Sequence, residues 1–287
     1  MVASIEYIER VIAVYGQAAE ANRQTPSRQG NVIVLTDDVG DDVMITADVH
    51  GHRQNFNAIV KRAALEEHPR RHLVMQEVCH GGPVYASNGG CMSYTLLEDV
   101  AKLKVRYPDR VHFLLSNHEM AELTDYPIVK GQKMLNLLFR YGLQEMYGPA
   151  TEKVREAYRG FLRTCPLAVR LPGDVVVSHS LPENLERVAF DKSILQRELG
   201  MEDFEPNGSL FNMVWGRDYR EENARRFAEQ IGASVLIHGH DPCPQGYKTP
   251  NAVQVILDCC ARPASYVVLP LDEPLDHAGI VERIEQL

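Results

Sequence analysis

Hydrophobic and polar residues alternate along the chain in two ways, which predicts a layered protein of helices and strands. Residues 3–22 and 53–67 carry apolar side chains at helical spacing, whereas residues 253–257 and 265–269 are short apolar runs typical of strands. Residues 23–30 are polar and predict a loop. Further helices are expected at 94–105, 130–165 (with a break near Gly148-Pro149), 183–201, 218–231 and 276–286.

Two early apolar runs predict a hairpin. Val32–Leu35 and Val43–Thr46 flank the turn-forming segment Asp37–Gly40. Strands and helices then alternate without a repeat or a clear linker. This order predicts an α/β or α+β layered fold. We expect a single domain over residues 1–287, with an N-terminal helix and loop (1–30), a core (32–270) and a closing helix (276–286).

Five short polar segments each follow an apolar run, and they supply the candidate chemistry. A buried strand that delivers polar groups at its C-terminal end is how α/β sheets build sites. The carboxylate, imidazole and amide groups in these segments are suitable ligands for one or two divalent ions. The segments are Asp48–Gly51, Gln76–Gly82, Ser116–Glu119, Ser178–Ser180 and Ile237–Pro242.

Composition narrows the class of protein. The chain is 45% hydrophobic and 24% charged, which is ordinary for a globular protein. Its net charge of −9 argues against a binder of nucleic acid or of anionic membranes, but is compatible with phosphorylated substrates because bound cations can reverse the local charge. No apolar run reaches the roughly 18 residues of a membrane-spanning helix. Six cysteines without a Cys-x-x-Cys pair, and an N-terminus unlike a signal peptide, predict a cytoplasmic protein without structural zinc.

The order of the five segments resembles the calcineurin-like metallophosphoesterases, and within them the phosphoprotein phosphatases. That family's pattern runs Asp-x-His-Gly, Gly-Asp-x-Val-Asp-Arg-Gly, Gly-Asn-His-Glu, His-x-Gly and Gly-His-Thr-Pro. Asp48–Gly51 and Asn117–Glu119 match it closely, and Gly239–Pro242 matches with Asp in place of Thr. The resemblance spans Asp48 to Asp258, which is most of the chain.

The resemblance implies a fold, an activity and a set of ligands. The fold would be a four-layer α/β/β/α sandwich with two packed mixed sheets. The activity would be that of a phosphoric monoester hydrolase, in which a metal-activated hydroxide attacks phosphorus. Two divalent ions are implied, Mn²⁺ first and iron or zinc as other candidates. Their implied ligands are Asp48, His50, Glu77, Asn117, His179 and His240.

The implied substrate is a Ser/Thr phosphoprotein or a small phosphorylated metabolite. Two alternatives stay open: a nucleotide phosphohydrolase, and a catalytically impaired homologue that binds metal and phosphate. His118 is the implied proton donor. Arg217 is the implied phosphate-binding residue because its planar fork matches phosphate oxygens. Arg53 is a weaker candidate for that role, and His238 competes with His240 as a ligand.

The second segment departs from the family. Glu77 stands where the family has a metal-bridging aspartate, so it either bridges or leaves a mononuclear site. His80 and Gly81 replace an Asp-Arg pair, in which the aspartate orients the proton-donating histidine and the arginine holds phosphate. His80 provides no fixed negative charge, and a neutral or cationic neighbour would lower the pKa of His118. His80 is therefore expected to be a hydrogen-bonding neighbour, the acid itself or an extra ligand.

Overall fold

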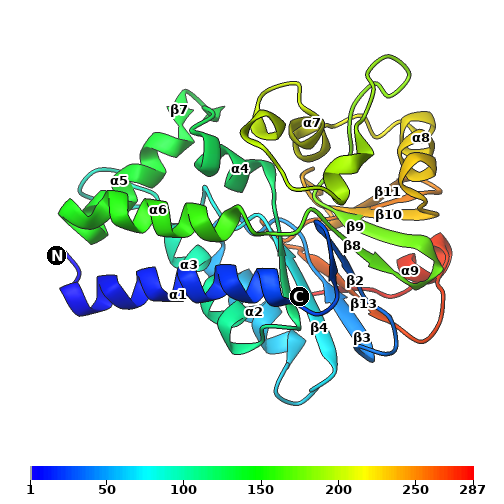
Figure 1. Ribbon diagram of the computed structural model, residues 1–287, viewed down its shortest axis with the longest axis horizontal. Helices are drawn as coiled ribbons and strands as arrows, with labels where there is room; N and C mark the ends of the chain where they lie inside the picture. Colours follow the sequence, from blue (N-terminus) through cyan, green and yellow to red (C-terminus); the bar gives the residue numbers. More distant parts are fainter. Residues whose placement is uncertain (1) are drawn as a thin grey trace.

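Two mixed β-sheets lie face to face in the computed structural model, which describes residues 2–287 (Figure 1). The strand order of the larger sheet is β1 (Arg28–Gln29), β2 (Val32–Val34), β8 (Ala168–Leu171), β9 (Val175–Ser178), β10 (Val235–His238), β12 (Gln254–Leu257) and β11 (Tyr247–Asn251). The strand order of the smaller sheet is β14 (Ile284–Gln286), β13 (Ser265–Pro270), β3 (Asp42–Ile45), β4 (Arg71–Gln76) and β5 (Val111–Leu114).

Period-two alternation in the strands builds both the inner and the outer apolar layers. Val43 and Ile45 of β3 pack in the layer between the two sheets, whereas Met44 packs in the cluster beneath the helices. Strand β9 repeats this arrangement, with Val175 and Val177 in the inner layer and Val176 in the outer one. Every strand residue named here is buried. Apolar side chains on both faces therefore fix each sheet between two layers.

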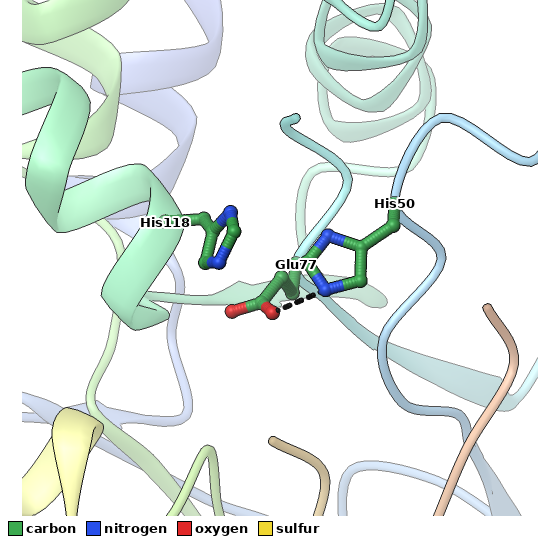
Figure 2. Close-up of side chains that lie close together, drawn as sticks. All are labelled: His50, Glu77 and His118. Atoms are coloured by element: carbon green, nitrogen blue, oxygen red, sulfur yellow. Dashed lines mark ion pairs between the residues drawn. The ribbon is translucent and has the colours of Figure 1, made fainter. Parts of the chain in front are cut away.

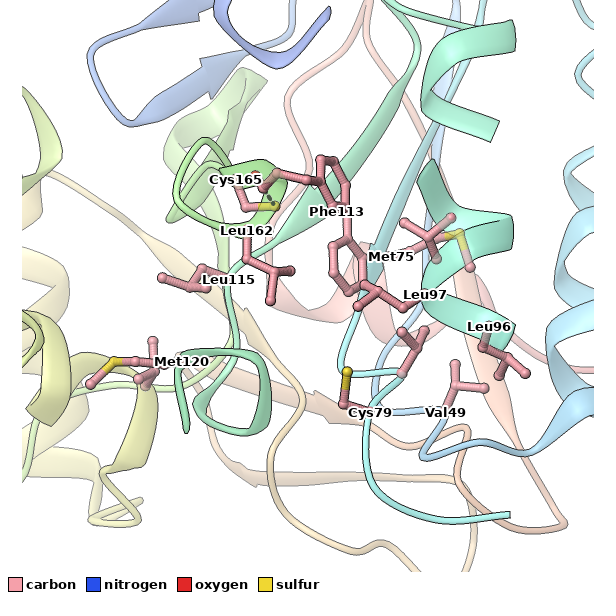
Figure 3. Packing of buried hydrophobic residues seen from close by; sticks show 14 of the residues in the cluster. Val49, Met75, Cys79, Leu96, Leu97, Phe113, Leu115, Met120, Leu162 and Cys165 are labelled. Carbon is pink, nitrogen blue, oxygen red and sulfur yellow. Dashed lines mark hydrogen bonds between the residues drawn. The ribbon is translucent and has the colours of Figure 1, made fainter. Parts of the chain in front are cut away.

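Helices cover the outer faces and complete the predicted four-layer α/β/β/α sandwich. The helices are α1 (Ile5–Gln24), α2 (Arg53–Ala63), α3 (Tyr94–Arg106), α4 (Asn117–Thr124), α5 (Leu135–Tyr147), α6 (Thr151–Leu162), α7 (Ser209–Trp215), α8 (Glu221–Ile231) and α9 (His277–Val281). Helix α1 packs against α3 and α6. Figure 3 shows Met75 and Phe113 of neighbouring strands in one cluster with Leu97 of α3 and Leu162 of α6. Within residues 2–287, no helix is both long and apolar enough to cross a membrane.

The predicted hairpin is wrong. Strand β2 pairs with β1 and β8 in the larger sheet, while β3 pairs with β4 and β13 in the smaller one. The segment Asp37–Gly40 therefore carries the chain from one sheet to the other. Ile33 and Val43 nevertheless meet in the inner layer, so their hydrophobicity reflects packing between sheets and not hydrogen bonding within one.

Two predicted helices are also wrong in whole or in part. Residues 183–201 form turns and the short 3₁₀ helix η3 (Lys192–Leu195), because Asn184 adopts a positive φ of 52° and the two buried apolar side chains, Leu185 and Ile194, are not at helical spacing. The closing helix expected at 276–286 ends at Val281, and strand β14 follows. Residues 130–165 do form two helices, separated by η1 (Gly148–Ala150) as expected. The short strands β6 (Val129–Lys130) and β7 (Lys133–Met134) and the 3₁₀ helices η2 (Pro172–Asp174) and η4 (Met201–Phe204) were not expected.

Candidate active site

The five polar segments meet because they leave the C-terminal ends of parallel strands, as the sequence predicts. Strands β3, β4 and β5 are parallel in one sheet, and β9 and β10 are parallel in the other. Backbone hydrogen bonds join the segments directly. The His50 N–H donates to Glu77 O at 3.0 Å, and the Gly239 N–H donates to His179 O at 3.1 Å. A third bond, from the Cys259 N–H to Asp48 O at 3.0 Å, joins the loops of the larger sheet to those of the smaller one, so the loop edge of both sheets is one connected surface.

Glu77 lies at the centre of the site and contacts histidines from both sheets. Its Oε1 atom is 2.9 Å from His50 Nε2, and its Oε2 atom is 2.9 Å from His179 Nε2. Figure 2 shows the side chains of His50, Glu77 and His118 gathered together. Glu77 is 1% exposed, and its backbone is in the left-handed region with a φ of 43°. Strained backbone of this kind concentrates at functional sites.

A second group of ligand-type atoms surrounds His179. Its Nε2 atom is 2.8 Å from Asn117 Oδ1 and 3.1 Å from His240 Nδ1. Asp48 lies at the margin of this group, where its Oδ1 accepts the His240 backbone N–H at 3.0 Å and is 3.8 Å from His179 Nδ1. A Cβ at Gly239 would lie 2.3 Å from Asp48 Oδ1, so only glycine permits this approach. All six residues expected as ligands thus lie in this one site.

Carbonyl oxygens fix the orientation of the three histidines expected as metal ligands, His50, His179 and His240. His50 donates Nδ1–H to Cys79 O at 3.0 Å, and His179 donates Nδ1–H to Gln76 Oε1 at 2.8 Å. His240 donates Nε2–H to Trp215 O at 3.2 Å. Carbonyl oxygens only accept, so the second ring nitrogen of each neutral histidine presents a lone pair to the site. Metal-binding histidines are held in this way.

The donor set fits divalent cations. Glu77 Oε2 is buried and has no hydrogen-bond partner among the described residues, although a histidine nitrogen lies beside it. Contacts near 3 Å between lone-pair atoms match ligands that share an ion at about 2.0–2.2 Å. Two groups of candidate ligand atoms lie within 4.8 Å of one another, His50–Glu77–His118 and Glu77–His179–His240. Glu77 belongs to both, so the residues present are suited to two adjacent ions.

Burial and the Glu77 charge dominate the electrostatics. Burial, followed by repulsion from Glu77, raises the pKa of Asp48 to about 7. Burial opposes protonation of His50, but attraction to Glu77 outweighs it and raises the pKa of His50 to about 10. Burial, then the neighbouring His179, lowers the pKa of His240 well below its usual value. The buried Glu77 carboxylate thus favours positive charge beside it, as its effect on His50 shows.

The altered second segment places His80 beside the expected proton donor. His80 Nδ1 is 2.9 Å from His118 Nδ1, and His80 Nε2 is 2.8 Å from Glu122 Oε1. Both ring nitrogens are engaged and the side chain is fully buried, so His80 occupies the place of a hydrogen-bonding neighbour. Burial, together with the surrounding histidines, lowers the pKa of His118 well below its usual value.

Glu122 and Gln76 are the polar contacts that sequence reasoning missed. Glu122 follows His118 by four residues on α4, so helical periodicity alone could have placed both side chains on one face. Gln76 is the last residue of β4 and carried no family signal. Glu119 accepts the backbone N–H groups of Val78 and Cys79 at 2.9 Å each.

Close backbone packing explains the loss of the family's arginine at position 81. A Cβ at Gly81 would lie 2.3 Å from the His50 carbonyl oxygen, and one at Gly51 would lie 2.3 Å from the Gly81 carbonyl oxygen. Gly81 has a φ of 149°, in a region that side chains avoid. The two loops therefore pack too closely for any side chain at position 81.

The two arginines expected to bind phosphate have different surroundings. Arg217 Nη1 donates to Asp241 Oδ1 at 2.8 Å, and Lys248 pairs with the other oxygen of the same carboxylate. Asp241 directly follows His240, so these two cations lie near the ligand cluster. Arg53 instead pairs with Asp99 on α3 and donates to Thr95 Oγ1 at 2.8 Å. The competing ligand His238 is buried between strands, where its Nδ1 is 3.2 Å from Ser178 O.

Known proteins share both the sequence pattern and the fold. Residues 42–244 match the family model described as calcineurin-like phosphoesterase. A probable serine/threonine-protein phosphatase of Encephalitozoon cuniculi is 23% identical over 261 residues, which cover 83% of this chain and 52% of that protein. The chain thus spans about half the length of that curated relative.

Solved structures have the same architecture at low identity. A Saccharomyces cerevisiae serine/threonine phosphatase with similarity to human phosphatase PP5 has a TM-score of 0.68 at 14% identity, covering 98% of this chain and 89% of that one. A cold-active protein-tyrosine phosphatase of a Shewanella species has a TM-score of 0.56 at 14% identity, covering 93% and 84%. By the extent of the family match, the chain belongs to the calcineurin-like phosphoesterase family.

Proposed function

We propose that this protein is a metal-dependent phosphomonoesterase of the phosphoprotein phosphatase type. The observation that carries the proposal is Glu77, whose two oxygens each lie 2.9 Å from a histidine nitrogen of a different ligand group. Asp48, His50, Glu77, Asn117, His179 and His240 would hold two divalent ions. Such ions supply Lewis acidity at phosphorus and a nucleophile derived from water near neutral pH.

The remaining roles fall to side chains around the ligands. His118 would transfer a proton at Nε2, because its Nδ1 is committed to His80. Arg217 would bind phosphate oxygens, and its hydrogen bond to Asp241 would hold the guanidinium in place. The donor set contains nitrogen and oxygen atoms, which suits Mn²⁺, iron or zinc.

A phosphorylated protein or a small phosphorylated metabolite is the proposed substrate. The curated relative described as a probable serine/threonine-protein phosphatase supports the first of these. The structural neighbours include both a serine/threonine and a tyrosine phosphatase, so the fold accommodates more than one kind of phosphoprotein.

Hydrolysis of p-nitrophenyl phosphate by metal-free and Mn²⁺-loaded protein tests the proposal. We expect turnover only after loading, and loss of nearly all turnover in His50→Ala. The control is His68→Ala, which alters an exposed histidine outside the site. If loaded wild-type protein binds Mn²⁺ but releases no phosphate, the chain is a metal-binding homologue without this activity.

A further inference from the structure

Glu122 is a buried acid outside the metal-ligand set, and it contacts the residue that replaces the family's aspartate. Its side chain is 1% exposed, and Oε1 lies 2.8 Å from His80 Nε2. Among residues 2–287, His80 is its sole ion-pair partner. Burying a carboxylate without a lysine or arginine costs free energy, so the hydrogen bonds around it must hold it in place.

Each neighbour of the Glu122 carboxylate donates a hydrogen bond. Asn136 Nδ2 is 3.2 Å from Oε1, and its amide orientation is fixed because Oδ1 accepts the Ile128 N–H at 2.9 Å. The Tyr158 hydroxyl is 2.8 Å from Oε2. Oε1 also receives His80 Nε2. An ionised carboxylate is an acceptor only, so it can accept from all three groups, and His80 donates to it through a proton on Nε2.

The proton on His80 Nε2 determines the proton position on His118. Neutral His80 then has a lone pair on Nδ1, which is 2.9 Å from His118 Nδ1. His118 must therefore donate its Nδ1–H to His80. Its Nε2 atom is left for the site, where Figure 2 shows the ring beside the Glu77 carboxylate. One chain of hydrogen bonds thus fixes both the orientation and the tautomer of the proposed proton donor.

We infer that Glu122 is a positioning residue, which acts through His80 to hold His118 with Nδ1 protonated and Nε2 directed at the leaving oxygen of the substrate. This inference rests on the proposed function. In that reaction a water oxygen bonds to phosphorus, and the bond from phosphorus to the ester oxygen breaks. His118 Nε2, unprotonated at the start, takes the proton that the water releases and gives it to the ester oxygen, so His118 ends as it began. Glu122 supplies, from α4, the fixed negative charge that position 80 no longer carries.

Glu122→Gln tests the inference because an amide cannot accept from all three donors. Its NH₂ group must face either Tyr158 or the His80–Asn136 pair, and its neutral oxygen accepts more weakly than a carboxylate, so His80 is held less firmly in the Nε2-protonated form. We expect kcat for phenyl phosphate, whose phenolate is a poor leaving group, to fall about 10²-fold with little change in KM. For 2,4-dinitrophenyl phosphate, whose leaving group needs no proton, kcat should fall less than about threefold.

Glu98→Gln is the matched control. Glu98 is also a buried glutamate, 3% exposed, and accepts hydrogen bonds from Tyr7, at 2.7 Å, and from Tyr147. We expect Glu98→Gln to lower the thermal unfolding temperature, but to change kcat for the two esters by the same factor. The inference is overturned if Glu122→Gln slows both esters equally, or if Glu98→Gln produces the same separation.

Nitrogen-15 NMR of histidine-labelled, metal-free wild-type protein provides a test that needs no turnover and no variant to fold. We expect His118 protonated at Nδ1 and His80 protonated at Nε2. An unprotonated His118 Nδ1 overturns the inference whatever the activity. If both protons are as expected but metal-loaded wild-type protein hydrolyses neither ester, the proposed function fails, and the positioning role fails with it.

Discussion

The side-chain oxygen of Gln76 accepts the Nδ1–H of His179 at 2.8 Å. The amide cannot turn over, because its Nε2 donates to Thr46 O at 3.2 Å. Both Gln76 and His179 are buried, so water cannot replace either partner. Gln76 therefore fixes the nitrogen that His179 presents to Glu77, although Gln76 itself binds no ion in the proposed site.

Loss of this hydrogen bond should weaken metal binding. We expect Gln76→Leu to raise the dissociation constant for Mn²⁺ about 10–100-fold, as removal of an outer partner of a metal-binding histidine commonly does. Calorimetric titration of metal-free protein measures this. Gln254→Leu is the control, because Gln254 is equally buried but lies in β12 and pairs with Asn251. Equal affinities in Gln76→Leu and wild type would show that His179 does not depend on Gln76.

Arg217 should contribute to substrate binding. We expect Arg217→Ala to raise KM for an aryl phosphate about 10–100-fold and to lower kcat less, because one charge-assisted contact to phosphate is worth roughly 1.5–3 kcal/mol. Arg220→Ala is the matched control, since Arg220 is an exposed neighbour that pairs with Asp218 and Glu186. A KM unchanged by Arg217→Ala, in steady-state assays, would remove this arginine from the site.

Restoring the family's arginine at position 81 should fail. Gly81→Arg would place Cβ 2.3 Å from the His50 carbonyl oxygen, and the backbone would have to move. We expect a loss of about 2 kcal/mol or more in the free energy of unfolding and no gain in phosphate affinity. Gly89→Arg is the control, because Gly89 also has a positive φ but open space around it. Urea unfolding that gives equal losses for both variants would contradict the steric explanation.

Lys104 should make stability depend on pH in the alkaline range. Burial lowers its pKa from 10.5 to about 8, although its ammonium donates to Thr25 Oγ1 at 2.8 Å and to Val111 O at 3.1 Å. Between pH 8 and pH 10.5 the unfolded chain binds this proton more strongly than the folded protein does. The free-energy cost of burying the Lys104 ammonium is therefore full below pH 8 and disappears as pH rises towards 10.5.

The measurement is the free energy of unfolding in urea at pH 7.5 and at pH 10, about one pH unit or less from the ends of this window. Lys104→Met should remove part of the rise in stability that the wild-type protein shows, up to about 1.4 kcal/mol per pH unit. Lys102→Met, on the exposed side of the same helix, should leave that rise unchanged. Identical pH dependence in wild type and Lys104→Met would contradict the assignment.

Much of the architecture was predictable because strand ends and ligand-type residues coincide in the sequence. Asp48, Glu77 and His179 follow their strands closely, and parallel pairing then brings them together. Sheet membership was not predictable in the same way. The apolar patterns of β2 and β3 fit a hairpin as well as they fit two packed sheets, because both arrangements bury alternate residues.

The finer contacts of the site depend on tertiary structure. Sequence reasoning identified His80 and Gly81 as departures but could not supply their partners. The hydrogen bond from His80 to Glu122 joins residues 42 positions apart, and the approach of Gly81 to His50 depends on two loops that meet through their backbones. Such contacts are set by the packing of whole elements and leave no local pattern.

The number of metal ions bound per chain tests the central claim, that Glu77 joins two ligand groups into one dinuclear site. Chelator-treated protein would be equilibrated with Mn²⁺, passed through a desalting column and analysed for metal, with Glu77→Ala measured alongside. The account predicts two Mn²⁺ ions per wild-type chain and a loss of both in Glu77→Ala, because each group depends on that carboxylate. One ion per wild-type chain, retained in Glu77→Ala, would contradict it.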